Sequence, residues 1–282
     1  METIKDFNEL SDRLQSSGRR YRVAAVEVTD PHSSEAIERA ESEGWAEVTR
    51  LHLDTVEASA NEAVSMIHRG EADVIMKGII NTDVLLRAIL NKEQRLVPKG
   101  NVLTHISAMD IPGLQKLLFM MDPAVIPYPT LEQRTAMIRY AVSVCGAYGI
   151  EEPRIALIHC TEKVSEKFPL TLDYVSLKDM CQRGELGRCI VDGPMDLRCA
   201  IDPEAMQIKH MESPIAGEAD VVIMPDIEAA NVFYKTITAF TAAHLAVGLQ
   251  GAQCPITLTS RADETDTKYN SLAMACLQVP NR

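Results

Sequence analysis

The sequence lacks a basic run, a membrane-length apolar segment and a signal-like start. Its 28 Lys and Arg residues are outnumbered by 40 Asp and Glu residues, which gives a formal charge of −12 at pH 7. This excess argues against broad non-specific binding to nucleic acid or to an anionic membrane. No apolar run approaches the roughly 18 residues of a membrane helix, and the first residues are polar and acidic. We therefore expect a cytoplasmic protein without nucleic-acid or membrane partners.

Metal-ligand spacings and disulfide signatures are missing as well. No two of the seven cysteines have C-x-x-C spacing, and no two of the seven histidines have H-x-x-x-H spacing. An odd number of cysteines in a long chain without a signal peptide favours buried free thiols. The sequence therefore gives little support for a metal site.

Glycine-rich phosphate loops are absent too, because none of the 14 glycines has another glycine two positions away. This excludes the G-x-G-x-x-G fingerprint, and the patterns G-x-x-x-x-G-K-[ST] and G-x-S-x-G are also missing. A P-loop nucleotidase, a typical Rossmann dehydrogenase and an α/β-hydrolase are therefore poor candidates. Any phosphate group must be held by another arrangement.

Short runs rich in Val, Ile and Leu alternate with longer amphipathic stretches. Buried parallel strands alternate with covering helices in this way, so the pattern predicts a doubly wound α/β architecture, with two domains at this length. Strands are expected near 21–28, 46–53, 72–76, 102–107, 116–121, 154–159, 188–191, 219–224 and 255–259. Helices are expected near 4–17, 35–44, 56–69, 83–91, 131–148, 172–183, 203–212, 229–249 and 268–277.

Polar residues directly after the predicted strands are candidates for a ligand site. Open α/β sheets bind ligands beyond the carboxyl ends of their strands, where loops lead into helix N-termini. These positions are Lys77-Gly78, Ser107, Asp122-Pro123, Thr161-Glu162, Asp192-Gly193-Pro194, Pro225-Asp226 and Ser260-Arg261.

The pair Ser260-Arg261 ends a buried strand and precedes an acidic turn. Arginine presents a planar fork of donors that suits phosphate, and a serine hydroxyl can donate one hydrogen bond to a developing oxyanion. The alternative is a loop serine beside a surface arginine in a salt bridge.

The stretch after residue 76 has the same order of strand, short polar loop and helix. Lys77, Thr82 and Arg87 could converge on one anion. In the alternative interpretation, Thr82 or Asp83 caps the helix, Arg87 is solvated and Lys77 pairs with a carboxylate.

Asn231 and Lys235 lie four residues apart at the start of a predicted helix, so they share one face of it. They could face a cleft or be solvated.

Taken in order, these segments resemble the phosphate acetyltransferase and phosphate butyryltransferase family, especially its shorter butyryltransferase branch. The matching stretches are 72–78 with Thr82 and Arg87, 102–107, 149–157, 192–194, 216–220, 231–235 and 259–263. The resemblance implies reversible transfer of a short-chain acyl group between coenzyme A and inorganic phosphate, giving an acyl phosphate. It further implies short-chain acid metabolism linked to an acyl-phosphate-using kinase, a homo-oligomer, and no metal or permanently bound cofactor.

The resemblance also implies a fold. Family members are similar to the isocitrate and isopropylmalate dehydrogenases, with two doubly wound α/β domains flanking a cleft. On this basis the first domain would comprise residues 1–133 and 255–282, and the second would comprise residues 134–254.

The family's chemistry implies roles for individual residues. Ser260 would stabilise the oxyanion, and Arg261 and Arg87 would hold phosphate groups. The implied substrate-binding residues are Lys77, Thr82, Arg87, Ser107, Asn231, Lys235 and Asp263. The cleft wall departs from the family at Arg198 and Ala230, which leaves the preferred acyl group open.

The family's proposed base is an aspartate seven residues after the serine, but Thr267 occupies that position here. We therefore expect its neighbour Asp266 to serve, while Asp263 lies nearer the Ser-Arg pair. An ordinary aspartate has a pKa near 3.9, far below a thiol near 8.5, so it would need burial to be an efficient base.

Two other functions stay open at this point. A binding protein could keep the coenzyme A cleft without the chemistry, as Thr267 suggests. A β-decarboxylating dehydrogenase relative would need a metal site built from several aspartates, together with a dinucleotide.

Overall fold

The computed structural model describes residues 2–280, and the chain divides into two compact units. Within the described residues, the terminal unit comprises 5–103 and 244–280, and the middle unit comprises 2–4 and 104–243. The sequence-based division instead changed domain near residues 133 and 254. The chain enters the middle unit at residue 104, before the predicted boundary at 133. The reason is that β5 (Leu118–Met121) pairs in parallel with β8 (Val221–Ile223) and so belongs to the middle unit.

The terminal unit is built on a sheet with the strand order β2-β1-β3-β10-β9. β1 is parallel to β2 and β3, β10 is parallel to β3, and β9 runs antiparallel to β10. The strands are β1 (Tyr21–Val26), β2 (Ala46–Leu51), β3 (Val74–Lys77), β9 (His244–Gln250) and β10 (Ile256–Thr257). β1 is buried along most of its length, as expected for a parallel strand covered on both faces, whereas the edge strand β2 carries several exposed polar residues.

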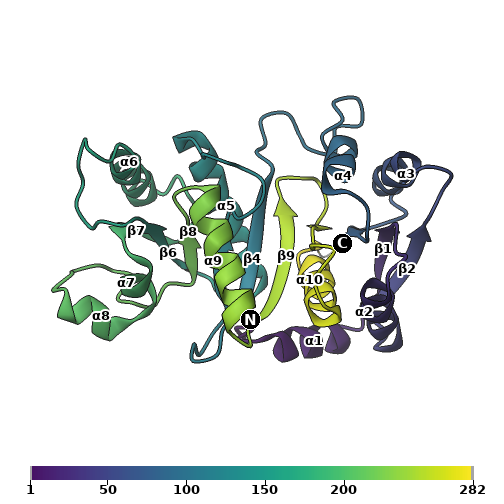
Figure 1. The fold of residues 1–282 in the computed structure, drawn as a ribbon, viewed down its shortest axis with the longest axis horizontal. Helices are drawn as coiled ribbons and strands as arrows, with labels where there is room; N and C mark the ends of the chain where they lie inside the picture. The colour runs from purple at the N-terminus through teal and green to yellow at the C-terminus, as the bar shows by residue number, and fades with distance from the viewer. Residues whose placement is uncertain (1, 281–282) are drawn as a thin grey trace. The chain divides into compact units, whose positions relative to one another are not determined.

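Helices cover both faces of this sheet. They are α1 (Phe7–Ser16), α2 (Pro31–Ser42), α3 (Val56–His68), α4 (Thr82–Ile89) and α10 (Thr265–Leu277). Figure 1 shows α3 and α4 on one side and α1, α2 and α10 on the other. Helix α10 is buried along most of its length because it packs against both α2 and β9.

The middle unit has a sheet with the strand order β4-β5-β8-β6-β7. Strands β5, β8, β6 and β7 are parallel, and β4 is antiparallel to β5. Besides β5 and β8, the strands are β4 (Thr104–Asp110), β6 (Arg154–Ile158) and β7 (Ile190–Met195). The helices are α5 (Leu131–Ala147), α6 (Leu170–Gln182), α7 (Leu197–Ile201), α8 (Pro203–Ile208) and α9 (Ile227–Phe240).

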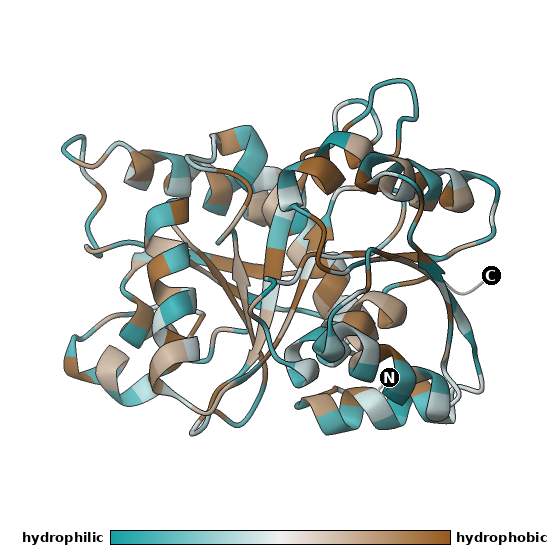
Figure 2. Cartoon of the chain, turned by 45° about the vertical axis from the view of Figure 1, so that its right-hand side comes forward, coloured by the Kyte–Doolittle hydropathy of each residue, from teal (hydrophilic) through white to brown (hydrophobic). Residues whose placement is uncertain are grey.

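The predicted α/β class is confirmed, and each predicted strand has a counterpart in one of the two units. Hydrophobic colours predominate on the strands in Figure 2, while the helices alternate between hydrophobic and hydrophilic residues. No helix within residues 2–280 has the length and apolar character needed to cross a membrane.

One predicted helix, over residues 229–249, was wrong in its second half. Helix α9 ends at Phe240, and residues 244–250 form β9, which pairs with β10. A short apolar run such as 245–249 fits a buried strand as well as a buried helix, so periodicity cannot separate the two. The five-residue helix α7 was too short for the pattern to detect.

Candidate active site

The carboxyl ends of four strands meet at one edge of the terminal sheet, because β2, β1, β3 and β10 are parallel. Glu27 follows β1, Lys77 ends β3, and Ser260 lies three residues after β10. The predicted site segments at Lys77 and at Ser260-Arg261 follow different strands in the sequence. The topology brings these segments together at this edge.

Ser260 lies in a tight turn that is closed by Asp263. The backbone N–H of Ser260 donates to Oδ2 of Asp263 at 2.7 Å, and the N–H of Asp263 donates back to the Ser260 carbonyl at 3.2 Å. The Ser260 hydroxyl accepts a long hydrogen bond, 3.4 Å, from the N–H of Ala262. The serine is exposed, and this arrangement leaves its own O–H hydrogen available to a ligand.

Arg261 is exposed, and its guanidinium forms no hydrogen bond or ion pair with any other residue in the described range 2–280. It is nevertheless close enough to Lys77 to lower the pKa of that ammonium. An unpaired guanidinium beside a serine hydroxyl is the combination that the sequence analysis proposed for phosphate and an oxyanion.

Lys77 is buried, with 1% of its surface exposed. Its Nζ donates to the carbonyl oxygen of Thr259 at 3.0 Å and to that of Gly78 at 3.3 Å. Burial and, to a smaller extent, the positive charges of Arg261 and Lys268 together lower the pKa of Lys77 to about 8. Lys77 is therefore enclosed by protein at this edge of the sheet and does not project into solvent. Its ammonium contacts backbone carbonyl oxygens, and not the carboxylate of the alternative interpretation.

Gly78 allows the loop after β3 to approach the end of β1 closely. Its N–H donates to the carbonyl of Val26 at 2.8 Å, and a Cβ at this position would lie 2.3 Å from the carbonyl oxygen of Glu27. A side chain cannot be accommodated at that distance, so the Lys-Gly sequence reflects a packing requirement.

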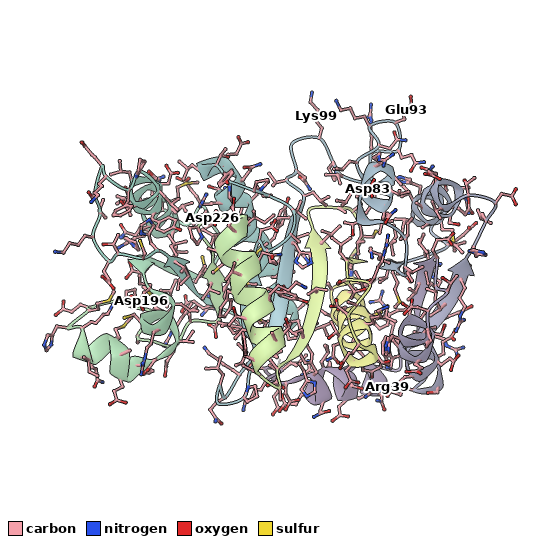
Figure 3. The ribbon with its side chains drawn as sticks, in the orientation of Figure 1. Arg39, Asp83, Glu93, Lys99, Asp196 and Asp226 are labelled. Carbon is pink, nitrogen blue, oxygen red and sulfur yellow. The ribbon has the colours of Figure 1, made fainter. Side chains whose placement is uncertain are left out.

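Arg87 lies one turn after the start of α4 and contacts Asp83 on the same helix, with 2.5 Å between Nη2 and Oδ2. Both side chains are exposed, and Asp83 is labelled on α4 in Figure 3. Thr82 is the first residue of α4, and Asn81 is its N-cap. In this structure Arg87 is therefore solvated, as in the alternative interpretation. A phosphate group would compete with Asp83 for its guanidinium.

A buried ion pair between Lys268 and Asp30 lies close enough to Lys77 to influence its charge, and it was not among the predicted site residues. Nζ of Lys268, which is 1% exposed, donates to Oδ1 of Asp30 at 2.7 Å and to the Ser33 hydroxyl at 2.9 Å. Burial by itself raises the pKa of Asp30, but hydrogen bonds from Lys268 and Ser33 outweigh it and lower the pKa to about 2. Asp30 precedes Pro31 as the N-cap of α2, so a capping signal was readable, whereas nothing in the sequence singled out Lys268.

Asp266 lies in the first turn of α10. Its side chain is 62% exposed, and Oδ1 lies 3.6 Å from Nη1 of Arg39. The carboxylate in direct contact with Ser260 is that of Asp263.

The other three predicted substrate-binding residues belong to the middle unit. Ser107 is buried in β4, and no other residue within 2–280 bonds to its hydroxyl. Nδ2 of Asn231 donates to the carbonyl of Pro123 at 3.2 Å, so this side chain is tied to the loop after β5. Lys235 is exposed, with Nζ 5.1 Å from the centre of the Tyr234 ring.

A second polar cluster in the middle unit joins Glu162, Asp196 and Cys199, whose ligand-type atoms lie within 4.8 Å of one another. Nζ of Lys209 already lies between the two carboxylates, donating to Glu162 at 2.5 Å and to Asp196. Asp196 is labelled in Figure 3. The ammonium supplies the charge that a cation would supply, so these contacts describe an ion-pair cluster. All seven cysteines are free thiols, and Cys160 is exposed.

Comparisons with known proteins agree with the resemblance seen in the motifs. The family model described as phosphate acetyl/butaryl transferase matches residues 5–276. A phosphate butyryltransferase of Clostridium acetobutylicum is 35% identical, covering 99% of this chain and 100% of its own. A phosphate acetyltransferase of Thermotoga maritima is 35% identical, covering 96% and 99%.

Solved structures give the same result. A branched-chain phosphotransacylase from Enterococcus faecalis V583 matches with a TM-score of 0.84 at 28% identity, covering 93% of this chain and 100% of that chain. The EutD phosphotransacetylase from Staphylococcus aureus matches with a TM-score of 0.79 at 16% identity, covering 97% and 99%, and so shares the fold.

Proposed function

The chain belongs to the phosphate acetyl/butaryl transferase family, and we propose that it moves a short-chain acyl group, butyryl or similar, between coenzyme A and inorganic phosphate. The observation that carries this proposal is the turn at Ser260, where an exposed serine is followed directly by Arg261, whose guanidinium has no protein partner among residues 2–280. The turn lies in a chain that is 35% identical, over nearly its whole length, to a phosphate butyryltransferase. Coenzyme A and phosphate act as substrates, and the proposal needs no bound cofactor.

The proposed reaction is direct attack within a ternary complex. A phosphate oxygen forms a bond to the thioester carbonyl carbon, the C–S bond breaks, and the sulfur leaves and takes up a proton. In the reverse direction the thiolate attacks the acyl phosphate and phosphate leaves. Both directions pass through an oxyanion, to which the Ser260 hydroxyl would donate, while Arg261 would hold the phosphate oxygens with its paired donors.

We place the carboxylate role on Asp263 in preference to Asp266. Asp263 contacts the Ser260 turn directly, whereas Asp266 is exposed and faces Arg39. A negative charge at Asp263 would also lie close to the thiol proton if the thiol approaches Ser260. Thr267, at the family's usual position, offers no carboxylate.

The remaining substrate contacts stay proposals carried over from the family. Thr82 and Arg87 would meet a phosphate group at the start of α4, and Arg87 would exchange Asp83 for that group. Ser107, Asn231 and Lys235 would contact substrate from the middle unit. A buried hydroxyl without a protein partner at Ser107 is consistent with such a role.

We also propose a homo-oligomer, a dimer or larger, in the cytoplasm. Helix α9 supports self-association, because it buries Ala230 and Tyr234 while Val232 and Phe240 are 66% and 84% exposed. The same helix also exposes Glu228 and Lys235, so these apolar side chains would meet a second copy between charges of opposite sign. Sedimentation equilibrium of the purified chain measures the state directly.

One assay separates the proposed transferase from its alternatives. The purified protein is incubated with butyryl-CoA and phosphate, and thiol release is followed with and without phosphate. Phosphate-dependent release supports the transferase, and tight coenzyme A binding without release supports a binding protein. NAD-dependent oxidation of a hydroxy diacid would support a dehydrogenase relative. Acetyl-CoA and branched acyl-CoA substrates, run in parallel, measure the acyl preference.

A further inference from the structure

The ammonium of Lys77 is enclosed by protein, and its hydrogen bonds within residues 2–280 go to backbone carbonyls. Only 1% of the surface of Lys77 is exposed. Its Nζ donates to the carbonyl oxygens of Thr259 at 3.0 Å and of Gly78 at 3.3 Å. A lysine that bound phosphate would instead need its ammonium presented to solvent or to a cavity. The geometry therefore separates Lys77 from the exposed cations Arg87 and Arg261.

The Thr259 carbonyl belongs to the peptide group that leads directly into Ser260. Strand β10 pairs with β3 only through Ile256 and Thr257, so the regular ladder ends before this peptide. Lys77 makes two further bonds to this segment, and the second of them lies beyond the ladder. Its backbone N–H donates to Oγ1 of Thr257 at 3.2 Å, and its Nζ reaches Thr259 two residues further along.

We infer that Lys77 is a positioning residue, whose buried ammonium holds the Thr259 carbonyl and thereby fixes the turn that presents Ser260 and Arg261. This inference rests on the proposed function for its effect on rate, and it changes the role of Lys77 from substrate ligand to support of the turn. The effect reaches the reacting atoms through the Ser260 hydroxyl.

The electrostatics of the edge fit this role. A charged donor makes stronger bonds to carbonyl oxygens than a neutral donor does, and burial makes both bonds matter more. Arg261 and Lys268 add positive charge near Lys77, and Asp263 and Asp30 partly compensate it. Two of these four groups lie in the turn itself: the carboxylate of Asp263 favours the charged ammonium of Lys77, whereas the guanidinium of Arg261 opposes it.

The first test is hydrogen exchange of the free protein, which needs no assumption about the reaction. Lys77→Met removes the donor while keeping an unbranched side chain, and Lys99→Met at an exposed lysine is the matched control. We expect faster exchange at the amides of Ser260, Ala262 and Asp263 in the Lys77 variant alone. Unchanged exchange there, or an increase spread evenly over the terminal unit, would overturn the inference.

The second test is steady-state kinetics of thiol release with phosphate varied. A misplaced Ser260 turn should lower kcat by about 10²-fold, with the KM for phosphate nearly unchanged. A raised phosphate KM with kcat unchanged would make Lys77 a substrate ligand and overturn the inference. If the wild-type chain shows no thiol release, the proposed function fails, and hydrogen exchange still decides the role of Lys77.

Lys77→Gln covers the case in which the methionine variant does not fold. Its amide retains N–H donors, so it should restore part of the protection of the turn and part of kcat. If the amides of Ser260, Ala262 and Asp263 exchange as fast in Lys77→Gln as they do in Asp263→Asn, the bonds to the carbonyls do not order the turn.

Discussion

Oδ2 of Asp263 lies 2.7 Å from the backbone nitrogen of Ser260, and the two residues exchange a second bond in which Asp263 N–H donates to the Ser260 carbonyl at 3.2 Å. The carboxylate therefore stabilises the turn that exposes the serine hydroxyl. It also places a negative charge next to the proposed reaction centre, at a position three residues after Ser260. The family's usual base position, four residues further on, is Thr267 in this chain.

Ser260→Ala should lower kcat by about 10²–10³-fold, as expected for removing one donor to an oxyanion. The KM values should change little, because the hydroxyl acts mainly in the transition state. Thiol release from butyryl-CoA with saturating phosphate measures the effect. Ser16→Ala, at an exposed position in α1, serves as the control, and near-normal turnover of Ser260→Ala would refute the assignment.

Asp263→Asn should reduce kcat by about 10²-fold, because the amide keeps a hydrogen-bond acceptor for Ser260 but loses the charge. Asp266→Asn is the matched comparison, with the same chemical change three residues away at an exposed side chain. We expect it to remain close to wild type in the same assay. The opposite ranking of these two variants would return the carboxylate role to Asp266.

Lys268→Met should destabilise the protein by about 3–5 kcal/mol, because it leaves the Asp30 carboxylate largely buried without its charged partner. Urea unfolding followed by circular dichroism measures this change. The double variant Lys268→Met with Asp30→Asn should recover part of the loss, since the uncompensated charge is then removed. No recovery would mean that packing of the lysine chain, and not its charge, carries the effect.

The same pair predicts the acid limit of stability. The pKa of Asp30 is lowered to about 2 from an ordinary value of 3.8, so the unfolded chain takes up the proton first as pH falls. Its stabilising contribution is complete above about pH 4 and is lost as pH falls toward 2. Urea midpoints measured from pH 5 to pH 2 should fall more steeply for wild type than for Asp30→Asn. Parallel curves would contradict this expectation.

Gly78→Ala should destabilise the protein by about 1–3 kcal/mol, because the new Cβ would lie 2.3 Å from the Glu27 carbonyl oxygen. Gly146→Ala is the control, since a Cβ at that position in α5 meets nothing within 4 Å. The control should stabilise the protein by about 0.5–1 kcal/mol through better helix propensity. Thermal unfolding of both variants gives the comparison, and equal effects would remove the packing argument for Gly78.

The amino-acid pattern was sufficient for every strand described except β9, because buried parallel strands appear as short Val, Ile and Leu runs between amphipathic helices. It was insufficient for residues 244–250, which form β9. The run from Leu245 to Leu249 is short and holds no polar side chain, so it fits a fully buried strand as well as a buried helix, and pairing with β10 decides between them.

By itself, the sequence determined the class of fold, the family motifs and the positions at which strands end in polar residues. Tertiary structure alone decided which of these residues meet. Ser260 and Lys77 are 183 positions apart, and they lie at one edge because β10 enters the sheet beside β3. Burial then decided which partners each charged group has. The enclosed ammonium of Lys77 bonds to backbone carbonyls, while the guanidinium of Arg261 is exposed and has no protein partner among residues 2–280. Spacing along a chain cannot encode that difference, because burial depends on all the elements that pack around a side chain.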